Sequence, residues 1–249
     1  MKRYFKIWWR LTHISFATNV TTVFSSILFL VGKILRFVFM LIFLLEIVNT
    51  AGGIAGYNRV QLVFFYLTFN LIDITAQVFL RGVYLFRQKV VSGEFDYYLV
   101  KPVNPLFRAL GGNADLLDLV TLIPLVIYIG GLIWRMQVGW LDVVLFLFML
   151  TVGFLLALSF HILVAALGVI TTEVDNAIMF YRDLTVMGRV PVDIYAAPIR
   201  EILTFIIPVA VMITFPAKAL LGLLSPGWIV FSLFLVTSFW FLSLRFWKY

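Results

Sequence analysis

The chain has 249 residues, of which 63% are hydrophobic and 12% are charged, and its formal net charge is +7. A soluble domain carries roughly 25% charged residues. A chain this apolar cannot cover its own surface with polar groups, so it needs lipid as its solvent. The absence of cysteine excludes disulfides and thiolate metal sites. The basic residues lie between apolar runs, which favours membrane-protein loops over nucleic-acid binding.

Residues 2–15 are predicted to form an amphipathic helix in the membrane surface. One arc of this helix carries the cations Lys2, Arg3, Lys6 and Arg10, and the opposite arc carries Tyr4, Ile7, Trp8, Leu11 and Ile14. No apolar stretch with a small-residue cleavage site follows closely, so a cleavable signal is not expected. Because Lys33 and Arg36 would lie near mid-depth in one straight helix, residues 16–33 are expected to continue along the interface as an elbow.

The remaining apolar runs predict an all-α membrane protein with six transmembrane helices. We expect an N-terminal interfacial helix and elbow over 1–34 and a transmembrane domain over 35–249. The predicted spans are 35–55, 60–84, 116–134, 141 to about 172, 202–214 and 228–244. The turn after the first span is rich in glycine (Gly52, Gly53, Gly56). Pro208, Pro216 and Pro226 interrupt the fifth apolar region, where a re-entrant pair of short helices is an alternative.

The charge distribution predicts the orientation of these spans. If the N-terminus is cytoplasmic, then the loops 81–113 and 171–201 and the C-terminus are cytoplasmic as well. Sixteen basic residues then lie inside, and only Arg59, Arg135 and Lys218 lie outside. This asymmetry predicts that both ends of the chain are cytoplasmic.

The loop 87–113 contains the segment richest in functional signals. Ser92 is a good helix N-cap, and Pro102 would end the helix after two turns. Phe95, Tyr98 and Leu99 would then share one face. Such a helix either docks a partner protein or packs against the protein's own spans, and its periodicity leaves both interpretations open.

Two stretches carry a resemblance to a known family. The first is Ser92-Gly93-Glu94-Phe95-Asp96 with Leu99, Lys101-Pro102 and Asn104-Pro105-Leu106-Phe107; the second is Gly188-Arg189-Val190-Pro191-Val192-Asp193-Ile194-Tyr195 with Ile202-Leu203-Thr204-Phe205-Ile206-Ile207-Pro208 and Phe215-Pro216-Ala217. They resemble, respectively, the signature loop and the fourth cytoplasmic segment with the fifth span of ABC-2 type exporter permeases. The elbow helix fits this family too, and the resemblance extends over nearly the whole chain.

The resemblance implies a permease subunit of an ATP-driven exporter in the bacterial inner (plasma) membrane. It would move a hydrophobic or amphiphilic substrate out of the cytoplasm or inner leaflet by alternating access. Its partners would be two copies of an ABC ATPase and a second permease, identical or different, within membrane lipid and without nucleic acid. ATP-Mg would bind the ATPase. This chain has no G-x-x-x-x-G-K-[ST] loop, so we expect a non-enzymatic subunit without a cofactor or metal of its own.

In such exporters the loop between the second and third spans is a coupling helix that sits in a groove of the ATPase. By resemblance, coupling falls on Gly93, Glu94, Phe95, Asp96 and Leu99, with Lys101, Pro102 and Pro105 shaping the exit of the loop. Phe95→Ala or Asp96→Ala is then expected to uncouple transport without loss of membrane insertion. The helix over 2–15 would lie near the ATPase as well.

Isolated polar residues in the spans are the remaining candidates. Glu46, Asp73 and His161 are candidates for the translocation path. Alternatively, the two carboxylates pair with Lys33, Arg36 or a partner subunit, and His161 makes an interhelical hydrogen bond.

Two further expectations concern residues near span ends and glycines. Asp118 and Asp142 lie near span ends, where exposure at the interface would explain them. Gly130, Gly131 and Gly153 are expected to allow close helix packing.

Other classes of function remain open from the sequence. An ion-coupled secondary transporter would need ionisable groups converging at mid-bilayer and usually an internal repeat, and only Glu46 and Asp73 are candidates. A membrane-embedded enzyme would have few catalytic groups, since the chain has two histidines and no cysteine. A third alternative to the exporter is a membrane anchor that holds an ATPase and transports nothing itself.

Overall fold

The computed structural model describes residues 2–20, 23–111, 116–171 and 174–248, and these residues are almost entirely helical. The α-helices are α1 (Lys2–Val20), α2 (Val23–Ala51), α3 (Arg59–Leu80), α4 (Phe86–Val91), α5 (Asp96–Leu99), α6 (Pro105–Gly111), α7 (Leu116–Met136), α8 (Trp140–Thr171), α9 (Val174–Val186), α10 (Ala197–Glu201), α11 (Phe215–Leu220) and α12 (Pro226–Lys248). Short 3₁₀ or π segments are η1 (Arg81–Leu85), η2 (Met187–Arg189), η3 (Val192–Ile194), η4 (Ile202–Ile206) and η5 (Ala210–Thr214). The predicted all-α membrane class is confirmed.

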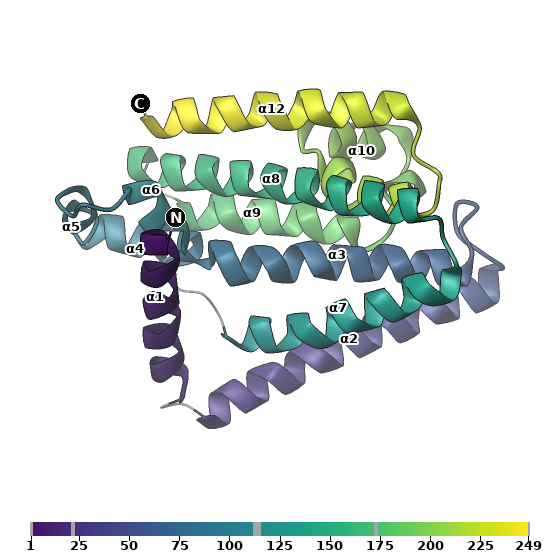
Figure 1. Cartoon of the computed structure of the whole chain (residues 1–249), viewed down its shortest axis with the longest axis horizontal. Helices are drawn as coiled ribbons and strands as arrows, with labels where there is room; N and C mark the ends of the chain where they lie inside the picture. Colours follow the sequence, from purple (N-terminus) through teal and green to yellow (C-terminus); the bar gives the residue numbers. More distant parts are fainter. Residues whose placement is uncertain (1, 21–22, 112–115, 172–173, 249) are drawn as a thin grey trace.

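The long helices form an elongated bundle with two distinct ends (Figure 1). Both chain termini and the segment 81–111 lie at one end, which we name the termini end. The turns 52–58, 137–139 and 221–225 lie at the other, which we name the turn end. α3 is the central helix, with 67% of its apolar window buried, whereas only 6% of the window in α2 is buried. α2 and α7 converge with α3 at the turn end and spread away from it toward the termini end (Figure 1).

The predicted elbow differs from the structure. Residues 23–33 are part of α2, which continues without a break to Ala51. At 29 residues this helix is about 44 Å long. Lys33 is tolerated about 15 Å from its start because an ion pair with Asp118 compensates the ammonium charge. The helix ends at Ala51, before the predicted end of the first span at residue 55. The predicted glycine turn follows it, since Gly52, Gly53 and Gly56 adopt positive φ.

The predicted path of the chain after residue 171 is wrong. Five helices within the described ranges are long and apolar enough to cross a membrane: α2, α3, α7, α8 and α12. α8 ends at the termini end and α12 begins at the turn end, so the chain must cross once more between them. α9 and η2 make this crossing alongside α8 and α3 (Figure 1). Residues 171–201 are therefore not a loop at the termini end.

Contacts along α9 and the segment after it establish the crossing. In the second half of α9, Tyr181 packs its ring on His161 of α8, with the centroids 5.2 Å apart. Farther along, Arg189 lies over the ring of Phe69. At the far end, Asp193 accepts a 2.8 Å hydrogen bond from Tyr57, in the turn that joins α2 to α3. The charges of this segment suggested a loop, although it runs through the bundle.

Residues 197–220 form a re-entrant helical hairpin. Ala197–Ile206 and Ala210–Leu220 meet at 78°, which supports the re-entrant alternative over a straight span at 202–214. The hairpin enters from the turn end and reaches Gly153, near the middle of α8. A Cβ on Gly153 would lie 2.4 Å from the carbonyl oxygen of Met212, so this glycine permits the close approach. Among the described residues, nothing lies within 4 Å of the Cβ positions of Gly130 and Gly131, so the packing predicted for them is not found within this part of the chain.

Candidate functional site

The loop between α3 and α7 differs in detail from its predicted helix. Ser92 caps the end of α4 and does not begin a new helix. Gly93 has a φ of +76°, a conformation that reverses the chain there. The helix that follows, α5, covers only Asp96–Leu99 and is therefore one turn instead of two. Asn104 starts α6, because its side-chain oxygen accepts a 2.9 Å hydrogen bond from the backbone N–H of Leu106.

Part of this loop packs against the protein itself. The Phe95 ring contacts Phe86 at 5.2 Å and Trp247 at 6.4 Å between centroids. Tyr98 is buried, and its hydroxyl accepts a 2.9 Å hydrogen bond from Lys89. The Arg108 guanidinium lies over the Tyr98 ring at 5.2 Å. Phe95 and Tyr98 therefore pack against the protein itself, as one of the two interpretations of this loop predicted.

The opposite side of the loop exposes apolar and acidic side chains together. We name it the loop patch; it consists of Val91, Glu94, Asp96, Tyr97, Leu99 and Val100. Its four large apolar side chains are exposed by 58–79%. Of the predicted face, Leu99 lies in the loop patch, whereas Phe95 and Tyr98 do not. Lys101 and Pro102 are exposed beside the patch.

α1 packs against the same loop. Arg3 donates a 2.9 Å hydrogen bond to the carbonyl oxygen of Pro102. The rings of Tyr4 and Phe107 meet edge to face with 4.9 Å between centroids. Through these contacts the N-terminal helix and the loop support each other at the termini end.

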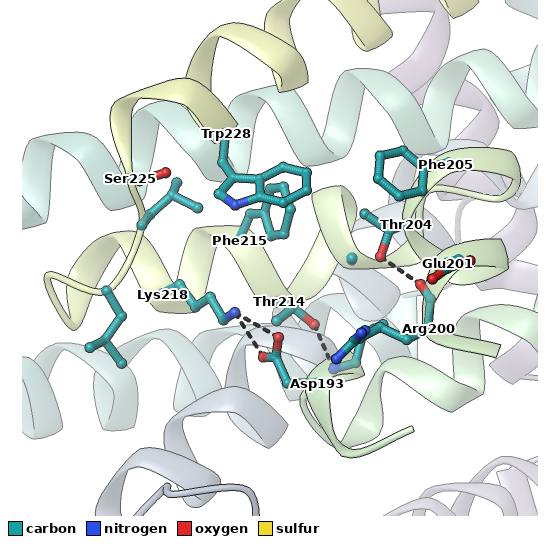
Figure 2. Close-up of a pocket in the computed structure, with 14 residues that line it drawn as sticks. Asp193, Arg200, Glu201, Thr204, Phe205, Thr214, Phe215, Lys218, Ser225 and Trp228 are labelled. Carbon is teal, nitrogen blue, oxygen red and sulfur yellow. Dashed lines mark hydrogen bonds and ion pairs between the residues drawn. The ribbon is translucent and has the colours of Figure 1, made fainter. Parts of the chain in front are cut away.

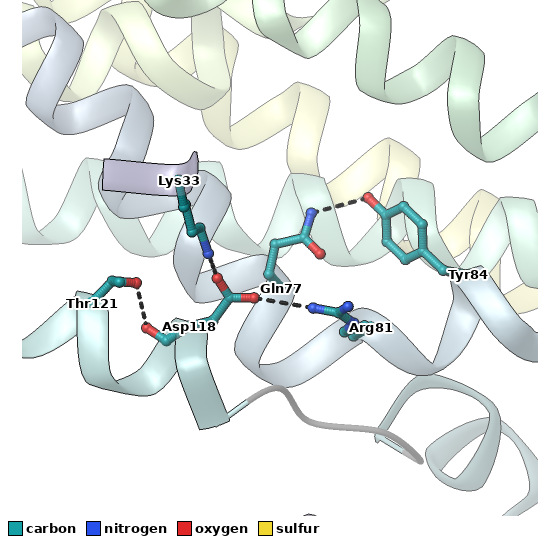
Figure 3. A network of polar contacts seen from close by, with 6 residues as sticks. All are labelled: Lys33, Gln77, Arg81, Tyr84, Asp118 and Thr121. Atoms are coloured by element: carbon teal, nitrogen blue, oxygen red, sulfur yellow. Dashed lines mark hydrogen bonds and ion pairs between the residues drawn. The ribbon is translucent and has the colours of Figure 1, made fainter. Parts of the chain in front are cut away.

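A buried carboxylate joins three helices near this loop. Asp118 of α7 is 1% exposed and forms ion pairs with Lys33 of α2 and, at 3.4 Å, with Arg81 of η1 (Figure 3). The expectation that exposure at the interface explains Asp118 is therefore wrong. The desolvated charge is stable because two cations face it.

A cavity of about 540 Å³ lies between α2, α3, α7 and η2. Its walls are mostly apolar, and Asp73 is the carboxylate among the described residues that line it. Lys33, Arg36 and Arg189 supply positive charge. Of the predicted path residues, only Asp73 lines this cavity. Glu46 is exposed elsewhere on α2, and the ion pairs found among the described residues do not include it.

His161 has a local structural role. It is buried and its Nδ1 lies 2.8 Å from the carbonyl oxygen of Ala157, one turn earlier in α8. The predicted interhelical hydrogen bond is therefore replaced by a bond within the helix and a ring contact with Tyr181. His161 and Asp73 do line one small cavity together, but its volume is only about 20 Å³.

A second polar cluster lies at the turn end, where Lys218 of the re-entrant hairpin meets residues outside the hairpin. Lys218 forms a 2.8 Å ion pair with Asp193 (Figure 2). Asp193 also accepts the hydrogen bond from Tyr57. Burial, followed by the neighbouring Asp193, raises the pKa of Tyr57, so its hydroxyl stays a donor. The pair borders a cavity of about 450 Å³. The sequence did not reveal this cluster, because the predicted topology separated Asp193 from Lys218.

The comparisons agree with this architecture. A family model described as "ABC-2 family transporter protein" matches residues 11–249. The chain therefore belongs to the ABC-2 transporter family and is a membrane permease of an ABC transporter. No curated protein and no solved structure gives a significant match. Permeases of this family normally work with ABC ATPases. No group of three or more His, Cys, Asp or Glu that could hold a metal occurs among the described residues.

Proposed function

We propose that this permease is the transmembrane half of an exporter and that the loop patch is its contact with the ATPase. The observation that carries the proposal is the exposure of Val91, Tyr97, Leu99 and Val100 beside two carboxylates. Exposed apolar side chains at the end of a membrane helix bundle, outside the long apolar helices, mark a protein-contact surface. Two ATPases would bind two permeases, identical or different, and ATP-Mg would be held entirely by the ATPases.

The orientation supports this proposal. The termini end carries eleven of the basic residues: Lys2, Arg3, Lys6, Arg10, Arg81, Arg87, Lys89, Lys101, Arg108, Arg245 and Lys248. The turn end carries Arg59, Arg135, Arg200 and Lys218. The positive-inside rule supports a cytoplasmic termini end. We propose that the membrane is the inner (plasma) membrane. The loop patch would face the compartment that holds ATP.

Coupling would proceed through rigid contacts. Closure of the ATPases on ATP would move the loop patch, and Phe95 would transmit the movement because its ring packs on Phe86 and Trp247. α1 would move with the loop through Arg3 and Pro102. Alternating access for a hydrophobic or amphiphilic substrate would follow from this movement.

The role of Phe95 is revised in this proposal. It supports the loop from inside, whereas Tyr97 and Leu99 are exposed by 65% and 58% and are available for contact. Gly93 sets the reversal, Glu94 and Asp96 supply charge, and Lys101, Pro102 and Pro105 shape the exit of the loop.

The test is the affinity of the permease for its ATPase, identified as a co-purifying subunit with a G-x-x-x-x-G-K-[ST] loop. The double variant Tyr97→Ala/Leu99→Ala should bind the ATPase at least about tenfold more weakly, because central apolar contacts typically contribute more than ~1 kcal/mol each. Asp96→Ala should lower ATP-driven transport. Leu223→Ala, which truncates an exposed apolar residue at the turn end, is the matched control and should bind normally. Unchanged affinity of the double variant would remove the loop patch from the mechanism.

A further inference from the structure

The cavity between α2, α3, α7 and η2 combines apolar walls with unbalanced charge. Phe37 and Leu41 of α2, Leu67 of α3, and Pro124 and Leu125 of α7 contribute to the walls. A volume of about 540 Å³ lies within the range of about 300–1,000 Å³ typical of small-molecule sites. The cavity is therefore large enough for part of an amphiphile.

Cations outnumber carboxylates around this cavity. Arg36 and Arg189 line it and each acts electrostatically on Asp73. The ion pairs found among the described residues join carboxylates to Lys33, Arg81 and Lys218, and none of them includes Arg36 or Arg189. Arg189 lies over the Phe69 ring at 5.6 Å, which holds the guanidinium at the cavity without neutralising its charge.

Asp73 does not balance these charges. Asp73 also lines the small cavity beside His161. Its carboxylate interacts electrostatically with Arg182 as well as with Lys33, Arg36 and Arg189. The carboxylate of Asp118, which faces Lys33, is shared with Arg81. Because positive charge in a helix bundle of low polarity is costly unless it is compensated, an anion is favoured here. A cationic ligand at Asp73 would meet several cations of like charge, so this cavity disfavours a cationic substrate.

We propose that this cavity binds amphiphiles with an anionic head group. The head group lies between Arg36 and Arg189, and the hydrocarbon chain lies against Phe37, Leu41 and Leu125. This assigns a substrate class to the proposed exporter, and it rests on the proposed function only for the statement that the bound molecule is transported. Binding itself requires no ATPase.

The test uses the full chain in nanodiscs of neutral phosphatidylcholine, without ATPase. Equilibrium binding is measured with dodecyl phosphate, dodecyltrimethylammonium and inorganic phosphate. Dodecyl phosphate should bind at least about tenfold more tightly than either of the other two, because only it satisfies both the cations and the apolar walls. The double variant Arg36→Gln/Arg189→Gln should lose at least about tenfold in affinity for dodecyl phosphate, and Asp73→Asn should gain several-fold.

Arg135→Gln is the matched control, since this exposed arginine lies at the end of α7 away from the cavity, and it should bind normally. Circular dichroism and tryptophan emission verify that each variant is folded. If the double variant misfolds, the gain with Asp73→Asn decides the result. Equal binding of the two amphiphiles, or a cation preference, would overturn the anionic assignment. Inorganic phosphate binding as tightly as dodecyl phosphate would overturn the amphiphile assignment. These outcomes leave the ATPase contact at the loop patch unaffected, so the two proposals fail separately.

Discussion

Single buried residues hold the parts of this permease together, and Asp118 is the clearest case. It joins α7 to Lys33 and Arg81 while only 1% of its surface is exposed. Asp118→Asn should lower the free energy of unfolding by about 3–5 kcal/mol, because it leaves two cations without their carboxylate. Glu46→Gln, at an exposed carboxylate of α2, should change it by less than about 0.5 kcal/mol. Reversible unfolding in mixed micelles measures the free energy of unfolding of both variants. Equal losses in the two variants would contradict the assignment of Asp118 as the carboxylate that joins these helices.

Gly153 permits the hairpin to enter the bundle. In Gly153→Ala the added Cβ would lie 2.4 Å from the Met212 carbonyl oxygen, so the hairpin must shift at a cost of about 1–3 kcal/mol. Gly130→Ala has open space and should be neutral or more stable by up to about 1 kcal/mol, because alanine favours a helix. Thermal unfolding of the two variants distinguishes these cases. A stable Gly153→Ala protein would mean that the hairpin does not lie against α8.

At the scale of elements, the crossing by α9 changes the predicted topology. Because the chain has no cysteine, single cysteines report sidedness cleanly. Ser92→Cys and Ala197→Cys are exposed positions at opposite ends of the bundle. A membrane-impermeant maleimide should label them from opposite sides of oriented vesicles. Labelling from the same side would restore residues 171–201 to a cytoplasmic loop and contradict the crossing.

The sequence predicted some elements well for a clear physical reason. α3, α7, α8 and α12 are long apolar runs bounded by charges, and such runs have few alternatives in lipid. α9 was missed because it carries Arg182 and Asp183, with Arg189 following in η2. In a hydropathy analysis such charges indicate a loop. In the folded protein, however, Arg182 and Arg189 lie near Asp73.

The sequence predicted which segment forms the candidate site, but it did not predict which side chains of that segment are exposed. The described part of the predicted loop, residues 87–111, does lie together with both termini. The helical periodicity grouped Phe95 and Tyr98 with Leu99, but the reversal at Gly93 and the short α5 turn the two aromatic rings inward. The sequence could not predict the cation-lined cavity, because only the packed bundle brings together its residues from α2, α3, α7 and η2.

At the scale of the whole molecule, the bundle separates the loop patch, which we propose as the ATPase contact, from the cavity that we propose binds substrate. α3 connects them, since Asp73 lines the cavity and the loop follows the end of the helix. A movement imposed on the loop would therefore reach the cavity along one rigid element. This arrangement is what an exporter driven by a separate ATPase requires.

Proximity of the loop patch to the ATPase tests this account most directly. Leu99→Cys, in a chain otherwise free of cysteine, is treated with a short thiol-to-amine cross-linker in the assembled complex, with Leu223→Cys as the control. We predict a cross-link from Leu99→Cys to the ATPase subunit and none from Leu223→Cys. An ATPase cross-linked through Leu223→Cys, or a complex that forms while Leu99→Cys remains unlinked, would contradict the account.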